Sequence, residues 1–235
     1  MIYGNNDYTE FENELGYTFK DKKNLDIAFT HKSFANEYKL EKVPSYERYE
    51  FLGDSILEFL CSRELFRRYP DMPEGELTKL RASLVCEYTL SQISRSLNFG
   101  NYLYLSNGEE QTGGRERNSI LCDLFESVLG AIYLDGGLKP ATKYVNKFLL
   151  TDIKSKSIFY DAKSILQEYA QKNSLTLSYR LISETGPDHN KTYTVQAVLG
   201  GKDVATGVGH TIKSAEQIAA HTTILELNIG EQDRN

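Results

Sequence analysis

Residues 46–60 read YERYEFLGDSILEFL, and the spacing of their side chains predicts a helix with two unlike faces. At about 100° per residue, one face is apolar and the opposite face is acidic. The predicted apolar face holds Leu52, Ile56, Phe59 and Leu60, and the acidic face holds Glu47, Glu50, Asp54 and Glu58. Phe51 falls among the acids, where an isolated chain would expose the ring to water. The stretch therefore predicts an acidic site and leaves one aromatic ring to be explained.

A second helix of the same kind is predicted for residues 118–135, NSILCDLFESVLGAIYLD. Asp123 and Glu126 stand about one turn apart, on the face opposite the apolar side chains. Ser127 and Gly130 are small neighbours on that polar face, so we expect that another group can approach the two carboxylates closely. If the two helices pack together, four carboxylates converge, namely Glu50, Asp54, Asp123 and Glu126.

The convergence of four carboxylates predicts a cation site. Four like charges cannot share a pocket at neutral pH unless some carboxyls are protonated or a cation binds. An all-oxygen set without His or Cys favours the hard ions Mg²⁺ and Mn²⁺. Such a set, with no nucleophilic side chain, is typical of metal-assisted displacement at phosphorus. Spacing alone leaves the alternative open, since the chain has 33 acidic residues and both acidic faces can simply be solvated.

The composition predicts a globular protein and excludes several classes. Of 235 residues, 40% are hydrophobic and 26% charged, and the net charge of −6 argues against a general polycationic nucleic-acid binder. Cys61, Cys86 and Cys122 lie far apart among apolar neighbours, which predicts reduced, packed thiols rather than a zinc site. No run approaches the roughly 18 apolar residues of a membrane span, so we expect a cytoplasmic protein without a membrane partner.

Hydrophobic periodicity divides the chain into two domains. Residues 1–150 have helical spacing almost throughout, with a Gly-rich charged stretch at 106–119 that predicts a mobile surface loop. Residues 151–160 read as a short polar connector, and residues 161–229 follow the order α-β-β-β-α. The expected elements there are a helix over 161–172, strands over 179–185, 191–200 and 202–210 around a Gly200-Gly201 turn, and a helix over 211–227 with Thr211 as N-cap. We therefore expect a mainly α fold, with an all-α domain followed by a small α+β domain.

The stretch at 46–60 resembles the signature helix of ribonuclease III, the nuclease family that cuts double-stranded RNA. The similarity continues through THKSFANE (30–37), PEGELTKLRASLV (73–85) and GGRERNSILCDLFESVLGAIYLD (113–135), and the resemblance covers nearly the whole chain. It implies an endoribonuclease that uses Mg²⁺, or Mn²⁺ in its place, and no small-molecule cofactor. The family's products carry a 5′-phosphate and a 3′-hydroxyl with short 3′ overhangs, made during the processing of ribosomal RNA precursors and the maturation or decay of messenger RNA.

The resemblance assigns roles to six acids. Glu50, Asp54, Asp123 and Glu126 match the family's metal-binding carboxylates, and Asp54 and Glu126 are expected to be catalytic. Glu47 and Glu74 match two further catalytic acids near the scissile phosphate.

The resemblance also implies a homodimer and accounts for the ring of Phe51. In the family, the aromatic residue after the second Glu of this helix inserts into a socket on the partner, so Phe51 is expected at a dimer interface. Two residues depart from the pattern: Tyr46 stands where Asn is usual, and Tyr49 stands where Leu or Met is usual.

Residues 161–229 resemble a double-stranded RNA-binding domain through KSILQEYAQ (163–171), GPDHNKTYTV (186–195) and GVGHTIKSAEQIAA (207–220). Such domains contact two minor grooves and the phosphates between them. By position, the implied RNA-binding residues are Ser164, Gln167 and Glu168 at one minor groove, His189 at the next, and Lys213 at phosphate, with Lys191 as a further candidate.

The start of the last helix departs from that domain family, which usually has two or three adjacent basic residues there. This chain has Ile212-Lys213-Ser214, and residues 159–228 hold six Lys plus Arg against seven Asp plus Glu. We therefore expect weak duplex binding with a shallow salt dependence.

Two other functions compete with a metal-dependent nuclease. A catalytically silent double-stranded RNA-binding protein could keep the fold for dimerisation, although it would have no physical reason to keep all six acids. A metal-independent ribonuclease would need a pair of His residues as acid and base, and His31 alone lies in the first 150 residues.

Overall fold

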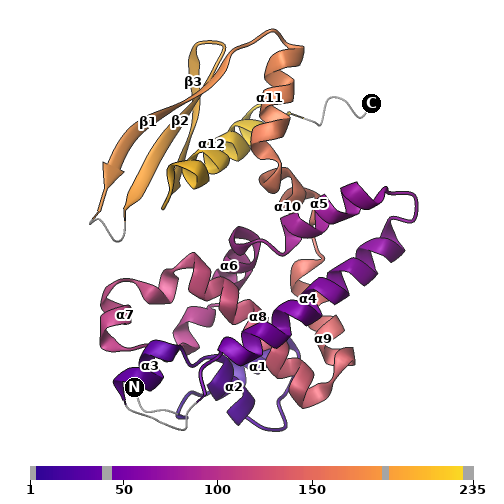
Figure 1. Ribbon diagram of the computed structural model, residues 1–235, viewed down its shortest axis with the longest axis vertical. Coiled ribbons are helices and arrows are strands. Elements are labelled where there is room, and N and C mark those ends of the chain that lie inside the picture. The colour runs from indigo at the N-terminus through magenta and orange to yellow at the C-terminus, as the bar shows by residue number, and fades with distance from the viewer. Residues whose placement is uncertain (1–3, 39–43, 187–190, 230–235) are drawn as a thin grey trace. The chain divides into compact units, whose positions relative to one another are not determined.

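Two long helices, α4 (Glu47–Arg68) and α8 (Asn118–Gly136), pack against each other at the centre of an N-terminal helical unit (Figure 1). The computed structural model describes residues 4–38, 44–186 and 191–229, and the chain divides into two compact units between residues 153 and 154. The first unit is helical, and the second combines helices with a three-stranded sheet. This is the mainly α fold class that the sequence predicts.

Shorter helices surround the central pair. They are α1 (Thr9–Leu15), α2 (Lys23–Ala28), α3 (Lys32–Glu37), α5 (Glu74–Leu84), α6 (Glu87–Ser96), α7 (Asn107–Gln111) and α9 (Leu138–Tyr144). Short turns of other helical types complete the unit, namely η1 (Phe99–Tyr102), η2 (Gly114–Glu116) and the π-type η3 (Val145–Leu149).

The core of this unit is built on α8, whose residues Leu124, Phe125, Val128 and Leu129 are fully buried. Helix α4 contributes Leu57 and Leu60 to the same core. The prediction that Phe59 lies on the buried face of α4 is wrong, because this side chain is 52% exposed. The buried line of α4 runs through Leu57 and Leu60, and Phe59 points away from α8.

Two glycines let α4 and α8 approach each other with their backbones almost in contact. A Cβ atom at Gly53 would overlap the carbonyl oxygen of Glu126, and one at Gly130 would overlap the carbonyl oxygen of Tyr49. Ser127 is fully buried and its hydroxyl donates to the carbonyl of Ala28 at 2.8 Å. The close approach that the small residues predict is therefore present at Gly130, and the group that approaches is the backbone of α4. Ser127 faces α2 instead.

The segment 106–119 is at the surface but is not the loop that its composition predicts. It forms α7 and η2, with the side chain of Ser106 capping α7 by accepting from the amide of Glu109 at 3.2 Å. Arg115 ties the segment down by donating to the carbonyl of Leu103 at 2.9 Å and by pairing with Glu110. These side-chain contacts compensate for the Gly-rich composition.

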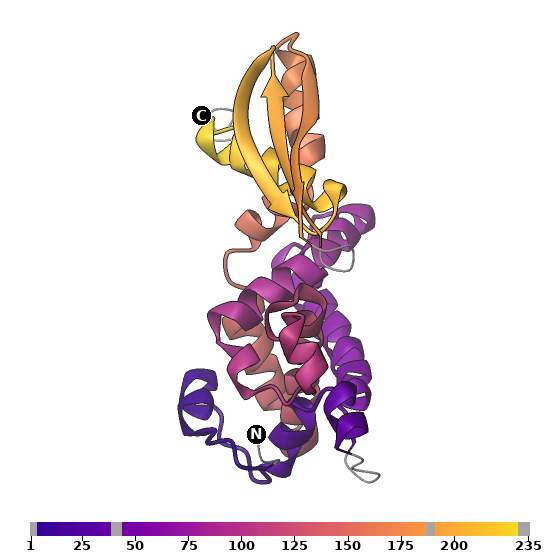
Figure 2. The same cartoon turned by 90° about the vertical axis from the view of Figure 1, so that its left-hand side faces the viewer.

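In the second unit, three antiparallel strands in the order β1-β2-β3 are covered on one face by two helices (Figure 2). The strands are β1 (Leu177–Thr185), β2 (Thr192–Leu199) and β3 (Lys202–Gly209), and the helices are α11 (Ala162–Lys172) and α12 (Ile212–Glu226). Gly200 and Gly201 turn the β2–β3 hairpin with φ of 58° and 78°, a conformation that suits glycine. The predicted N-cap is confirmed, because the Thr211 side chain accepts from the amide of Ser214 at 3.0 Å.

The expected connector contains a helix, α10 (Ile153–Tyr160). Phe159 of this helix is buried, and its ring meets the ring of His221 on α12 edge-on at 5.1 Å. The side chain of Gln217 donates to the carbonyls of Phe159 and Tyr160 at 2.6 and 2.7 Å. The ring of Phe159 and the side chain of Gln217 therefore bind the end of this segment to the second unit.

None of the helices in the described part of the chain is long and apolar enough to cross a membrane.

Candidate active site

The contact between α4 and α8 brings carboxylates of both helices together. Glu50 and Asp54 flank the close approach at Gly53, and the opposing backbone belongs to Glu126 itself. Asp123 lies one turn before Glu126 on α8. Because the helices touch at these residues, their acidic side chains share one half-buried region between the two elements.

Burial, with repulsion from nearby acids, raises the pKa of three carboxyls of this region. Burial raises the pKa of Glu126 to about 8, and repulsion from Asp54 and Asp123 adds to the effect. Burial, with repulsion from Asp123, likewise raises the pKa of Glu50 to about 7. For Asp123, burial raises the pKa to about 6 against the opposing effect of a hydrogen bond from Tyr46. The region therefore holds protons in the absence of a cation.

The donor set fits a hard divalent cation by its chemistry. It consists of carboxylate oxygens whose mutual repulsion a cation would relieve. Among the described residues, no three His, Cys, Asp or Glu side chains already lie close enough together to hold a metal ion. The residues that could hold one are Glu50, Asp54, Asp123 and Glu126.

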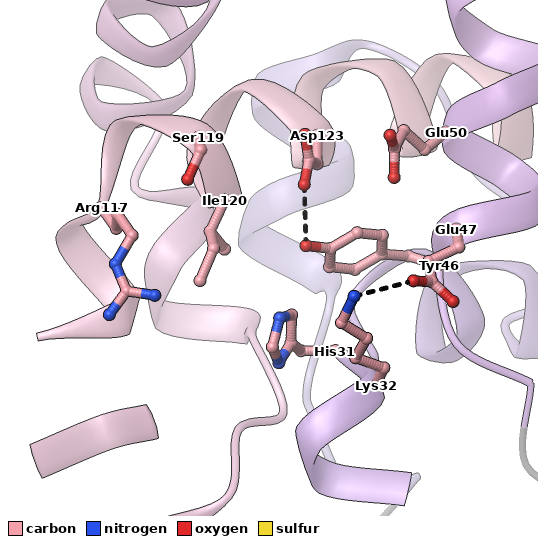
Figure 3. A pocket seen from close by; sticks show the side chains of 9 residues that line it. All are labelled: His31, Lys32, Tyr46, Glu47, Glu50, Arg117, Ser119, Ile120 and Asp123. Carbon is pink, nitrogen blue, oxygen red and sulfur yellow. Dashed lines mark hydrogen bonds and ion pairs between the residues drawn. The ribbon is translucent and has the colours of Figure 1, made fainter. Parts of the chain in front are cut away.

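Beside these acids lies an open pocket of about 270 Å³ (Figure 3). It is lined by His31, Lys32, Tyr46, Glu47, Glu50, Arg117, Ser119, Ile120 and Asp123. The ammonium group of Lys32 lies 3.2 Å from Glu47 Oε1, and its hydrogen bond holds the pKa of Glu47 below the usual value. Burial lowers the pKa of His31, which favours the neutral ring. The pocket thus joins acids with two cations, Lys32 and Arg117, an arrangement suited to a phosphate near a bound metal.

The structure does not bring Glu74 to the other acids. Glu74 begins α5, is exposed, and accepts a hydrogen bond from the Thr78 hydroxyl at 2.9 Å. Helix α5 follows the far end of α4, and roughly 20 Å of helix lies between Asp54 and that end (Figure 1). A catalytic role for Glu74 stays a prediction.

Sequence reasoning missed three residues of the pocket. Lys32 and Arg117 lie within 30–37 and 113–135, two stretches that resemble the family, but nothing in their spacing relates them to the acids. In the sequence, Tyr46 is only a departure from the family pattern. Its hydroxyl donates to Asp123 Oδ2 at 3.0 Å across 77 positions of sequence, a pairing that only the fold reveals (Figure 3).

Phe51 projects from α4 and is 77% exposed. Phe59 and Phe66, at intervals of eight and seven residues, are 52% and 75% exposed and lie on the same side of the helix. Three exposed phenyl rings along one helix are unusual for a surface facing water and make this side of α4 a candidate contact surface.

Comparison with known proteins agrees with this arrangement. A model of the Ribonuclease-III-like family matches residues 21–153, and a model of the double-stranded RNA binding motif matches residues 162–227. The curated Ribonuclease 3 of Oceanobacillus iheyensis is 43% identical over 225 residues, which cover 94% of this chain and 99% of that protein. The chain belongs to the ribonuclease III family. It is an endonuclease of double-stranded RNA.

Other members of the ribonuclease III family show similar agreement. Ribonuclease 3 of Listeria monocytogenes is 40% identical over 94% of this chain and 98% of that protein, and the enzyme of Geobacillus kaustophilus is 41% identical over 96% and 93%. A solved structure of the nuclease domain of ribonuclease III from Campylobacter jejuni superposes with a TM-score of 0.57 at 40% identity, covering 61% of this chain and 96% of that domain. A second structure of the same domain gives a TM-score of 0.55 at 41% identity.

The predicted RNA-binding residues of this ribonuclease III lie on two helices and a strand edge. Ser164, Gln167 and Glu168 are exposed together on α11. Lys213 is exposed in the first turn of α12, and Lys191, next to β2, pairs with Glu184 at 2.5 Å. His189 lies outside the described residues. The roles of these residues stay predictions.

Proposed function

We propose that this ribonuclease III hydrolyses double-stranded RNA with Mg²⁺ held by Glu50, Asp54, Asp123 and Glu126, and that it acts as a homodimer. The observation that carries the proposal is the close approach of α4 and α8 at Gly53, which half-buries acids of both helices and raises the pKa of Glu50 and Glu126. Burying such a set of acids costs free energy, and a divalent cation removes that cost when it replaces the protons.

The side chains around the acids have separate tasks in this proposal. Lys32 and Arg117 attract the RNA backbone to the pocket, and Glu47 keeps Lys32 at its edge through their ion pair. Tyr46 donates a hydrogen bond to Asp123. When bound, Mg²⁺ supplies a Lewis acid for the charge that develops on the reacting phosphate and on the leaving 3′ oxygen. The products then carry a 5′-phosphate and a 3′-hydroxyl.

The homodimer is supported by the exposed rings of α4, foremost Phe51. One of the Campylobacter jejuni structures is described as showing flexibility in a region involved in dimer formation of the nuclease domain. Two active sites in one dimer, one for each strand, would leave staggered ends with short 3′ overhangs. We place its action in the cytoplasm, on precursors of ribosomal RNA and on structured messenger RNA.

The metal dependence and the products can be tested together. A fully paired RNA of about 30 base pairs, labelled at its 5′ end, is incubated with wild-type protein in EDTA, Ca²⁺ or Mg²⁺, and the fragments are analysed by mass spectrometry. We expect cleavage with Mg²⁺ alone, and fragments with 5′-phosphate and 3′-hydroxyl ends. Cleavage in EDTA, or 2′,3′-cyclic phosphate ends, would contradict the proposal. Duplex binding without cleavage in any divalent ion would favour the catalytically silent alternative.

A further inference from the structure

Tyr46 places a buried hydroxyl on one carboxylate of the site. The residue is 3% exposed, and its hydroxyl donates to Asp123 Oδ2 at 3.0 Å (Figure 3). Within the described residues, no other hydrogen bond to the Asp123 carboxylate is present. One donor therefore sets the orientation of this carboxylate and leaves Oδ1 without a hydrogen bond.

The backbone and the ring of Tyr46 are both held in place. Its amide donates to the carbonyl of Thr30 at 2.8 Å, and its carbonyl accepts from the amide of Glu50 at 2.9 Å at the start of α4. The ring packs against His31 at 5.7 Å between centroids, and the amide of His31 donates to the carbonyl of Tyr104 at 3.1 Å. Because these contacts come from several segments, the hydroxyl has a fixed position relative to α8.

The chemistry of the pair determines which atom donates. A phenol keeps its proton near neutral pH, so the Tyr46 hydroxyl stabilises a negative partner by donating.

We propose that Tyr46 is a positioning residue, whose hydroxyl fixes one oxygen of Asp123 so that the other is available to a divalent cation. The inference rests on the proposed metal-dependent function and assigns a role in it to a residue outside the ligand set. Donors that orient metal-binding carboxylates in this way typically change metal affinity or activity by 10- to 100-fold when they are removed.

The test compares two tyrosines at the start of the same helix. Tyr46→Phe removes the hydroxyl and keeps the ring. Tyr49→Phe is the matched control, because it removes a hydroxyl that donates to Asn24 Oδ1 at 3.0 Å, away from the acids. Binding of Mn²⁺ to the RNA-free protein is measured by titration calorimetry, and the fold is checked by thermal unfolding. We expect Tyr46→Phe to bind Mn²⁺ roughly tenfold more weakly than wild type and Tyr49→Phe to bind it equally well.

A cleavage assay separates positioning from damage to the fold. We expect Tyr46→Phe to need about tenfold more Mg²⁺ for its half-maximal rate, with the wild-type maximal rate restored at saturating Mg²⁺ and an unchanged KM for RNA. Equal Mn²⁺ affinities of Tyr46→Phe and wild type would overturn the inference, and so would a maximal rate that no concentration of Mg²⁺ restores. A wild-type protein that binds no Mn²⁺ and cleaves in EDTA would overturn the proposed metal-dependent function itself. This result differs from one in which wild type needs the metal and Tyr46→Phe behaves like wild type, which overturns only the role of Tyr46.

Discussion

The carboxyl of Glu126 is costly to ionise in the metal-free protein, because it is largely buried and faces other acids. Its pKa is raised from about 4.5 to about 8, with Glu50 at about 7. Between the ordinary and the raised pKa, the folded protein binds more protons than the unfolded chain does. The contribution of these two carboxyls to the free energy of unfolding of the metal-free protein therefore falls as pH rises from about 4.5 to about 8.

This sign leads to a prediction for Glu126→Gln. At pH 8 in EDTA, we expect this variant to be more stable than wild type by about 2 kcal/mol, because the neutral amide removes the repulsion. Near pH 4.5, where the carboxyl is protonated in the folded protein and about half protonated in the unfolded chain, the two proteins should have nearly equal stability. Urea unfolding at the two pH values measures the difference. A wild-type protein at least as stable as Glu126→Gln at pH 8 would contradict the prediction.

Some residues of the candidate site can be predicted from the sequence, and others cannot. Glu50, Asp54, Asp123 and Glu126 could be chosen from their spacing on two helices and from the resemblance. The hydroxyl of Tyr46 could not, since its partner lies on a helix whose position depends on the packing of the whole unit. The same is true of Phe59, because a regular wheel does not define which part of an apolar face a neighbouring helix will cover.

At the scale of elements, the site depends on how closely α4 and α8 approach. Gly53→Ala would place a methyl group where the carbonyl of Glu126 lies, and neither backbone can move without disturbing the core. We expect a loss of stability of more than about 3 kcal/mol and loss of cleavage.

Gly75→Ala on α5 is the matched control, because a Cβ there meets no atom within 4 Å. This variant should gain up to about 1 kcal/mol from the better helix propensity of Ala. Thermal unfolding of the two variants tests the comparison, and a Gly53→Ala protein as stable as wild type would show that the helices are not in backbone contact.

The hydrophobic periodicity of the sequence predicts most of these helices and strands, but it does not predict the side-chain contacts that hold them. The helices and strands of the second unit follow the predicted pattern, including the Thr211 cap. The predicted loop at 106–119 failed because Arg115 and Ser106 supply hydrogen bonds that composition does not reveal. The connector at 151–160 contains α10, which its polar composition does not reveal, and Phe159 of this helix is buried.

The first turn of α12 leads to a prediction for RNA binding. Lys213 is exposed there, whereas Lys163 of α11 pairs with Glu216 of α12. The unit has a hydrophobic core of its own, so it can be studied alone as residues 154–235. We expect its duplex binding to weaken with salt, with a slope of log K against log salt shallower than about −4. Lys213→Gln should make this slope shallower by roughly 0.9, the contribution of one phosphate contact. Fluorescence anisotropy at several salt concentrations measures the slope, and a slope steeper than −4 would contradict the expectation.

At the scale of the whole molecule, the exposed rings of α4 predict assembly. Phe51→Asp should convert a homodimer to a monomer and lower cleavage strongly, because a charge cannot be buried at an apolar interface without a partner. Sedimentation equilibrium checks the mass. Arg48→Asp is a control for charge on the same helix, and a Phe51→Asp protein that sediments as a dimer would show that Phe51 lies outside the interface.

The most direct test of the central claim is cleavage and binding measured together for Glu126→Gln. Glu58→Gln is the control, since the Glu58 carboxylate lies on α4 but pairs with Arg81 at 2.8 Å. With 30-base-pair RNA and Mg²⁺, we expect Glu126→Gln to bind the duplex as wild type does and to cleave it at least roughly a thousandfold more slowly, the loss that removal of a group acting in the transition state produces. Glu58→Gln should cleave within a fewfold of wild type. Cleavage by Glu126→Gln at the wild-type rate would contradict the claim that the acids of α4 and α8 form the active site.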